Sequence, residues 1–161
     1  MNIRDYKPSD IEEISSLYYN TVHLVNAKDY SESQINAWAP SIYEKSFWAR
    51  HFKKYRVFVA ETDGMIIGFA EFELTGHIDC FYVHHNWQRK GIGTSLIKRI
   101  EVAAQNKHVE QLFADVSITA KPFFKRQGFT AVREQMIMYR SQNFEQFYMV
   151  KPGVKIVNCE L

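Results

Sequence analysis

Apolar and polar residues follow one another along this chain in two rhythms. Apolar residues recur every three or four positions from about residue 10 to 26 and again from 91 to 107, which predicts two amphipathic helices. Shorter β-rich stretches lie before, between and after them. We expect strands over 2–6, 57–61, 65–74, 77–83, 111–117, 130–139 and 144–151, and short helices over 31–38, 41–53 and 120–127.

Local signals mark several of these boundaries. Ser9 with Glu12 and Ser31 with Gln34 have the spacing of a capping box, in which side chain and backbone bond each other at a helix start. The pair Asp63-Gly64 between two β-rich stretches predicts a tight hairpin. The element order is therefore strand, helices, three strands, helix, strand, helix, two strands, a mixed α/β plan.

The 161 residues suit one domain, which we expect to span 1–151, with 152–161 as a C-terminal tail. The composition, 46% hydrophobic and 24% charged, excludes a disordered or collagen-like chain. Cys80 and Cys159 are far apart in the sequence, so we expect no disulfide framework. This low cysteine content favours a reducing compartment, and we expect a cytoplasmic protein. No apolar run is long enough for a membrane span, and no signal peptide is expected.

Charge is distributed unevenly. Residues 1–80 carry 8 Lys and Arg against 12 Asp and Glu, a net −4, whereas 81–161 carry 12 against 6, a net +6. The second half is therefore expected to meet an anionic ligand. The Lys and Arg residues are scattered, so we expect no nucleic-acid partner.

One loop in the basic half carries the most specific motif. After the strand that ends at Val83, the segment 84–94 contains Arg89, Lys90 and two glycines at a predicted helix start. Unpaired N–H groups and the helix dipole favour a phosphate there. Position 96 is Leu96, so the dinucleotide fingerprint is absent, as is the Gly-Lys-Ser/Thr of a P-loop. The loop therefore predicts a pyrophosphate cradle.

This loop resembles the signature of the GNAT superfamily, the acetyl-CoA-dependent N-acetyltransferases. The match is Gln88-Arg89-Lys90-Gly91-Ile92-Gly93 after a strand ending Phe81-Tyr82-Val83. A second family element matches Ser117, Ala120, Phe123-Phe124 and Gly128-Phe129. The element order is similar to the family's from residue 2 to about 151.

The resemblance implies a mixed, mostly antiparallel sheet of about seven strands, helices on both faces, and a V-shaped cofactor cleft. It also implies that acetyl-CoA is the acetyl donor, with the pyrophosphate on the α-helix start and the pantetheine arm along the strand before it. The implied cofactor-binding residues are Phe81, Tyr82, Val83, Gln88, Arg89, Lys90, Gly91, Ile92, Gly93, Thr94, Ser117, Ala120, Phe123 and Phe124.

Acetyl transfer to an amine needs a group that accepts a proton, because an alkyl ammonium of pKa ~10.4 is almost fully charged at neutral pH. His77 and Asp79 share one face by the period of two and occupy positions where the family often has His or Glu, so both are predicted catalytic residues. Glu71 and Glu73 are the reserve candidates. Many relatives have Tyr where this chain has Phe124, which cannot donate a proton to the departing thiolate.

The acceptor is expected to be a small primary amine, with direct transfer in a ternary complex. Tyr30 and Trp38 lie on the segment that covers the acceptor side in the family and are the predicted substrate-binding residues. The alternatives are a protein lysine or N-terminal acetyltransferase and a non-catalytic acyl-CoA sensor. No metal site is expected at the adjacent His84-His85. The final strands suit a homodimer and internal packing equally well.

Overall fold

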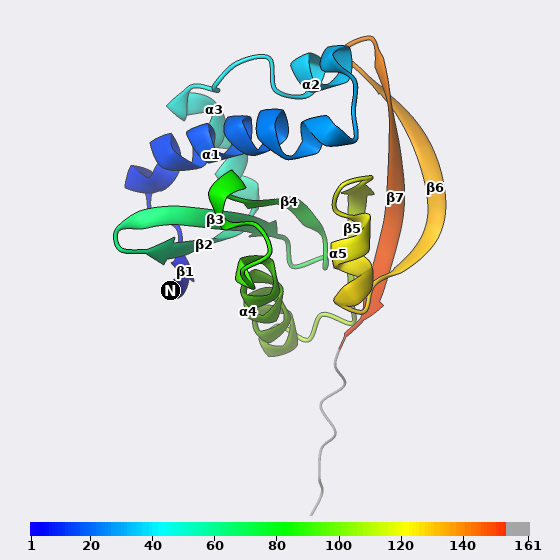
Figure 1. Ribbon diagram of the computed structural model, residues 1–161. Helices are drawn as coiled ribbons and strands as arrows, with labels where there is room; N and C mark the ends of the chain where they lie inside the picture. The colour runs from blue at the N-terminus through cyan, green and yellow to red at the C-terminus, as the bar shows by residue number, and fades with distance from the viewer. Residues whose placement is uncertain (154–161) are drawn as a thin grey trace, which may run out of the picture.

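The structure is a computed structural model in which residues 1–153 are described (Figure 1). Its strands and helices follow the predicted order closely. The elements are β1 (Asn2–Asp5), α1 (Ile11–Leu24), α2 (Glu32–Trp38), α3 (Lys45–His51), β2 (Arg56–Thr62), β3 (Met65–Phe72), β4 (Ile78–Val83), α4 (Ile92–Asn106), β5 (Gln111–Ser117), α5 (Lys121–Arg126), β6 (Thr130–Tyr139) and β7 (Gln142–Pro152), with 3-10 turns η1 (Pro8–Asp10), η2 (Asn26–Lys28), η3 (Phe52–Lys54) and η4 (His85–Trp87).

The seven strands within residues 1–153 form two antiparallel sheets, ordered β1-β2-β3-β4 and β5-β7-β6. The two sheets meet where β4 and β5 run parallel, through an isolated bridge between His77 and Phe113. There the Phe113 N–H donates to the Gly76 carbonyl over 3.0 Å. Beyond this point the two strands diverge, which opens the predicted V (Figure 1). The mixed α/β class is confirmed.

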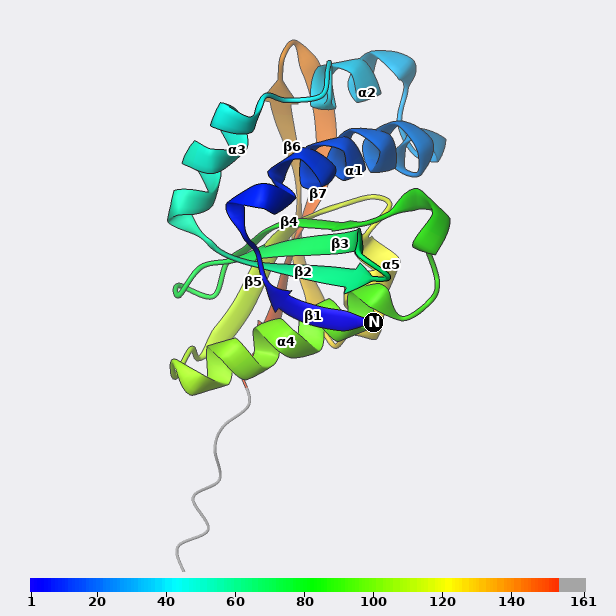
Figure 2. The same ribbon diagram turned by 90° about the vertical axis from the view of Figure 1, so that its left-hand side faces the viewer.

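Alternate residues of β2 serve two different cores. Val57 and Val59 pack with α1 and α3, whereas Phe58 and Ala60 pack with α4. A pleated strand points successive side chains to opposite faces, so a run of apolar residues indicates a strand covered on both sides. Figure 2 shows α1 and α3 on one face of this sheet and α4 on the other.

The local signals had different outcomes. The Ser31–Gln34 capping box forms at the start of α2, and Asp63 and Gly64 both take the positive φ of a tight hairpin turn. The Ser9–Glu12 prediction was wrong, because α1 begins after Asp10 with no side-chain cap. The Asp10 carboxylate instead accepts from the Lys7 N–H at 2.7 Å and pairs with Arg4 at 2.8 Å.

The last two strands combine a buried face and an exposed one. Phe144 and Phe147 on β7 are buried, whereas Met136 and Met138 on β6 are exposed. In the described part of the chain, β6 is an edge strand and has one backbone edge available for pairing with a second copy. A homodimer through β6 stays a prediction. Most of the predicted tail, including Cys159, lies outside the described residues. In residues 1–153 no helix combines the length and apolar character needed to cross a membrane.

Candidate active site

The divergence of β4 and β5 creates one large cleft of about 690 Å³. Its walls come from both strands, the α4 and α5 starts, and the region between α1 and α2. The predicted site residues that line it are Tyr30, Trp38, Asp79, Phe81, Tyr82, Val83, Gln88, Arg89, Gly91, Ile92, Gly93, Thr94, Ser117, Ala120, Phe123 and Phe124. Lys90 and His77 do not line it; the Lys90 ammonium lies 4.9 Å from the centre of the Trp87 ring.

The α4 start lies at the end of this cleft where the sequence predicts the pyrophosphate, here called the phosphate end. Gly91 is the N-cap, with a left-handed φ of 81°, and Arg89 before it also has a positive φ of 62°. In this conformation the N–H groups of the first turn of α4 have no carbonyl partner within the helix and face outward. The Gln88 side chain donates to the Val83 carbonyl at 2.7 Å, which ties the loop to the end of β4.

The second glycine of the motif has a different role from the first. A Cβ on Gly91 would meet nothing within 4 Å, whereas a Cβ on Gly93 would lie 2.9 Å from the Phe123 ring. Gly93 therefore lets α5 pack closely against α4. The same aromatic layer contains Phe124, 3% exposed, which packs against Phe81 and Phe129. The rings with hydroxyls on the cleft are those of Tyr18, Tyr30, Tyr82 and Tyr139.

The pantetheine prediction depends on a free backbone edge on β4. Within the described residues β4 pairs with β3 on one side, and its other edge faces the cleft beyond the bridge at His77. The register between β3 and β4 shifts between Ala70 and Phe72, so Asp79 and Cys80 stand opposite Glu71. This bulge turns Asp79 toward the cleft, which agrees with the frequent use of bulges at active sites.

Asp79 is held by a tyrosine from outside the strand. Its side chain is 40% exposed, and its Oδ2 accepts a hydrogen bond of 2.8 Å from the hydroxyl of Tyr55, which follows η3. Burial, with the neighbouring Asp79 carboxylate, raises the pKa of Tyr55, so Tyr55 stays a donor across the neutral range. Asp79 therefore presents a fixed, partly exposed carboxylate to the cleft.

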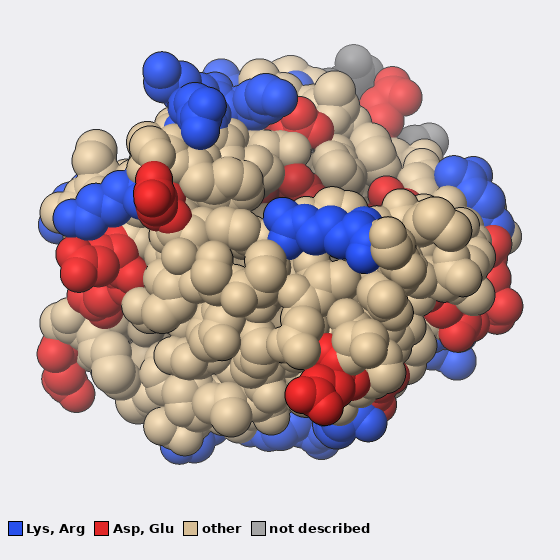
Figure 3. All heavy atoms as spheres, turned by 90° about the horizontal axis from the view of Figure 1, so that it is seen from above, with Lys and Arg blue, Asp and Glu red and all other residues tan. Residues whose placement is uncertain are grey.

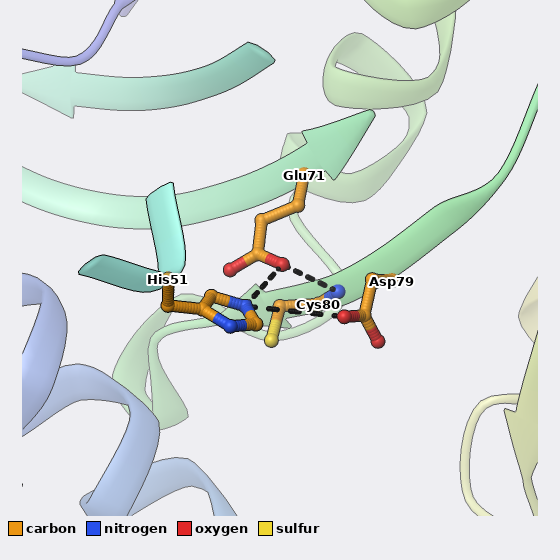
Figure 4. Close-up of side chains that lie close together, drawn as sticks. All are labelled: His51, Glu71, Asp79 and Cys80. Atoms are coloured by element: carbon orange, nitrogen blue, oxygen red, sulfur yellow. Dashed lines mark hydrogen bonds and ion pairs between the residues drawn. The ribbon is translucent and has the colours of Figure 1, made fainter. Parts of the chain in front are cut away.

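Behind Asp79 lies a histidine–glutamate pair. Glu71 on β3 is fully buried, and its Oε2 lies 2.8 Å from Nε2 of His51 at the end of α3. Burial raises the pKa of Glu71, whereas the hydrogen bond to Glu71 raises the pKa of His51. Figure 4 shows dashed lines from the same His51 ring nitrogen to the carboxylates of Glu71 and Asp79, with 3.9 Å between Nε2 and Asp79 Oδ2.

The same group supplies the donor set best suited to a metal ion in residues 1–153. Donor atoms of His51, Glu71, Asp79 and Cys80 all lie within 4.8 Å of one another. A hydrogen bond with His51 already occupies Glu71 Oε2, and one from Tyr55, outside the group, occupies Asp79 Oδ2. Burial raises the pKa of the Cys80 thiol well above its usual range, so Cys80 is a poor nucleophile.

The predicted catalytic histidine, His77, lies at the closed end of the V. His77 precedes β4, bridges to β5 and stacks on Phe113 with 5.2 Å between ring centres. Its Nδ1 lies 3.1 Å from Glu73. His77 is thus brought next to Glu73, and Asp79 next to Glu71. Sequence reasoning missed His51 and Tyr55, which approach from the segment before β2.

The acceptor side is covered by α2 and the turn between β6 and β7. The Arg140 guanidinium donates to the Ala37 carbonyl at 3.1 Å, and Gln34 donates to the Asn143 carbonyl at 2.7 Å. Trp38 meets Tyr30 edge-on beneath this cover, with 5.2 Å between ring centres. Seen from above, the middle of this face is mostly uncharged, and Lys, Arg, Asp and Glu side chains lie mainly around its rim (Figure 3).

Known proteins share the sequence pattern and the architecture of this chain. A model of the acetyltransferase (GNAT) domain matches residues 26–144. The Escherichia coli (strain K12) protein described as "Uncharacterized N-acetyltransferase YafP" is 33% identical over 149 residues, which cover 92% of this chain and 94% of that protein.

Solved structures agree. A GCN5-related N-acetyltransferase from Rhodopseudomonas palustris aligns with a TM-score of 0.88 and 27% identity over 94% of each chain. The PaiA N-acetyltransferase from Thermoplasma acidophilum, solved with coenzyme A, aligns with a TM-score of 0.79 and 20% identity over 94% of this chain and 98% of that one. With its cleft and helix-start cradle, this chain belongs to the GNAT family and is an acetyl-CoA-dependent N-acetyltransferase.

Proposed function

We propose that this enzyme acetylates the primary amine of a small molecule by direct transfer, with acetyl-CoA and the amine in the cleft together. One observation carries the proposal. The α4 start and the Asp79 carboxylate line the same continuous cleft. A donor bound at one end and an amine beside the carboxylate at the other would meet without an enzyme-bound acetyl group.

The covered acceptor side favours a small molecule over a protein segment. The contacts from α2 to the turn between β6 and β7 join the two arms of the V above the cleft. Aromatic rings line the space beneath: Tyr18, Trp38, Tyr82, Tyr139 and Phe144. Such rings attract an ammonium group through their π faces and pack against an apolar substituent.

Asp79 is the residue proposed to take the proton from the amine. It is a partly exposed carboxylate on the cleft wall, fixed by Tyr55 at 2.8 Å. An alkyl ammonium of pKa ~10.4 is less than about 0.1% neutral at pH 7, so a carboxylate that receives its proton assists attack. The raised pKa of the Cys80 thiol argues against an acetylated cysteine on the pathway.

Thiol release from acetyl-CoA tests the proposal with aromatic amines, alkyl amines, polyamines, aminoglycosides, amino acids and lysine peptides. We expect a small amine to have the highest kcat/KM, with intersecting initial-velocity lines when both substrates are varied. Parallel lines together with an acetylated enzyme seen by intact mass would exclude direct transfer. A lysine peptide that exceeds every small amine would exclude the substrate class.

A further inference from the structure

A single nitrogen links the cleft to the protein interior. Nε2 of His51 lies 2.8 Å from Oε2 of Glu71 and 3.9 Å from Oδ2 of Asp79. Asp79 is 40% exposed on the cleft wall, whereas Glu71 is fully buried. Figure 4 shows both carboxylates near the same ring nitrogen. The arrangement forms a chain of three titratable groups from the cleft inward.

Glu71 is poorly provided with hydrogen bonds for a buried carboxylate. Its Oε1 has no partner among the described residues, and its Oε2 has His51 and a long contact of 3.4 Å with the Cys80 N–H. A buried carboxylate with few donors favours its neutral, protonated form. Burial accordingly raises the pKa of Glu71, so the interior end of the chain readily takes up a proton.

A lone carboxylate competes poorly with an alkyl amine for a proton. In water an alkyl ammonium and a free carboxylic acid differ by roughly 6 pKa units, so the proton strongly prefers the amine. A second acceptor with a higher pKa makes the transfer less unfavourable. The Glu71–His51 pair has this property, because the pKa of each member is raised.

We propose that Glu71 is the final acceptor of the amine's proton and that His51 carries it inward from Asp79. This inference rests on the proposed function, in which Asp79 takes that proton first. His51 and Glu71 act through Asp79 and not on the substrate, so they are positioning residues.

The proton balance of this relay is simple. Neutral His51 has its ring proton on Nδ1, so Nε2 takes the proton that Asp79 received from the ammonium nitrogen, and the resulting imidazolium passes the Nε2 proton to Oε2 of ionised Glu71. A small rotation of the partly exposed Asp79 side chain brings its Oδ2 within hydrogen-bond range of Nε2. The amine, His51 and Glu71 end neutral and Asp79 ends ionised. After acetyl transfer the proton returns to solvent by the reverse route.

The charged and titratable groups around His51 come from three elements. Glu71 on β3 and Asp79 and Cys80 on β4 face the ring, and Lys54 and Tyr55 flank it from η3 and its end. The two carboxylates raise the pKa of His51, and the Lys54 ammonium lowers it. Replacing Glu71 with glutamine removes the largest of these influences, so the pKa of His51 should fall.

The test uses Glu71→Gln and His51→Gln with two acceptors that the enzyme accepts, an alkyl amine and a weakly basic aromatic amine. We expect kcat/KM for the alkyl amine to fall tenfold to hundredfold, and to fall much less for the aromatic amine, which is already neutral at pH 7. The acid limb of the pH–rate profile should move to lower pH, because the raised acceptor is gone. The affinity for acetyl-CoA should be unchanged.

Two further variants sharpen the result. Residues that act as one unit are not additive, so Asp79→Asn combined with Glu71→Gln should lose no more activity than Asp79→Asn alone. Glu61→Gln is the matched control: it removes a strand glutamate that pairs with Arg4 at 3.0 Å and does not line the cleft. Its turnover and pH profile should equal those of the wild type.

The relay would be overturned if kcat/KM fell equally for both amines while the acid limb of the pH–rate profile stayed in place. It would also be overturned if the activity losses of Asp79→Asn and Glu71→Gln multiplied in the double variant. If Glu71→Gln fails to bind acetyl-CoA or to unfold cooperatively, His51→Gln alone decides, because His51 is partly exposed. Failure of the proposed function has a different signature. In that case Asp79→Asn itself would transfer acetyl groups at the wild-type rate, whatever the two relay variants do.

Discussion

The two ends of the cleft differ in the groups that form them, backbone at one end and side chains at the other. The phosphate end consists of backbone from consecutive residues, 88–94, shaped by the left-handed Gly91 at the α4 start. The end where proton transfer is proposed, called the proton end, consists of side chains from three elements, His51 of α3, Glu71 of β3 and Asp79 of β4. We therefore expect cofactor binding to depend on local backbone shape and proton transfer to depend on tertiary packing. Substitutions at the two ends should therefore change different constants.

The largest effect is expected at the proton end. Asp79→Asn keeps the shape of the side chain but removes its capacity to accept the amine's proton. We expect kcat to fall by about 10²–10³, with the Kd for acetyl-CoA within twofold of the wild type. Thiol release and calorimetry measure the two quantities. A wild-type kcat would remove Asp79 from the mechanism.

His77→Gln is the counterpart of this variant. His77 is paired with Glu73 and stacked on Phe113 outside the cleft lining, so we expect its kcat to stay within twofold. A hundredfold fall, with acetyl-CoA affinity intact, would instead make His77 the base and reverse the assignment.

At the phosphate end, Gly91→Asp should weaken acetyl-CoA binding at least tenfold, which is ~1.4 kcal/mol or more. The substitution adds a carboxylate to an anion site and strains a φ of 81°. Gly64→Asp is matched to it, since Gly64 has a φ of 74° and equally open space in the distant β2–β3 turn. If acetyl-CoA binding were weakened to a similar extent in both variants, backbone strain or net charge would explain the effect, and not a phosphate site at Gly91.

A several-fold effect is expected on the acceptor side. Trp38→Ala removes a ring that lines the cleft and contacts Tyr30 and Phe144 edge-on, so the KM for the amine should rise threefold to tenfold. The Kd for acetyl-CoA should not change. Phe47→Ala removes a ring that is 40% exposed and outside the cleft lining, and its KM should equal that of the wild type. An unchanged KM in Trp38→Ala would exclude this ring from acceptor binding.

The smallest effect on activity is expected outside both ends of the cleft, at the ion pair of Arg4 and Asp10. Hydrogen bonding from Arg4 lowers the pKa of Asp10, so the pair contributes stability above the ordinary Asp pKa of ~3.9 and loses it as pH falls through the lowered value. Asp10→Asn should lower the free energy of unfolding by about 1.5–3 kcal/mol at pH 7 without changing kcat. In urea titrations the difference from the wild type should shrink on acidification. A constant difference would show that the charge of Asp10 contributes little.

The backbone of the α4 start could be predicted from the sequence because its residues are contiguous. A strand, a basic loop and glycines at a helix start specify the cradle locally, and the order of elements followed from periodicity and turn residues. Even there the close contact of Gly93 with Phe123 could not be predicted, because it depends on how α5 packs.

The proton end could be predicted only in part. The period of two paired His77 with Asp79, but β4 begins at Ile78 and the bulge opposite Glu71 separates their surroundings. His51 and Tyr55 arrive by tertiary packing that no local pattern encodes. One signal was present: Glu71 lies in the apolar stretch Ile66–Phe72, and a carboxylate in a strand buried on both faces needs a partner.

The most direct test of this division measures both constants in both variants. Acetyl-CoA affinity by calorimetry and kcat at saturating acetyl-CoA are determined for Asp79→Asn and Gly91→Asp, with the same amine and the same preparations. We expect Asp79→Asn to have a lower kcat and an unchanged Kd for acetyl-CoA. Gly91→Asp should have a higher Kd and, at saturating acetyl-CoA, a kcat within about threefold of the wild type. If both variants change both constants alike, the cleft does not divide into a binding end and a proton end.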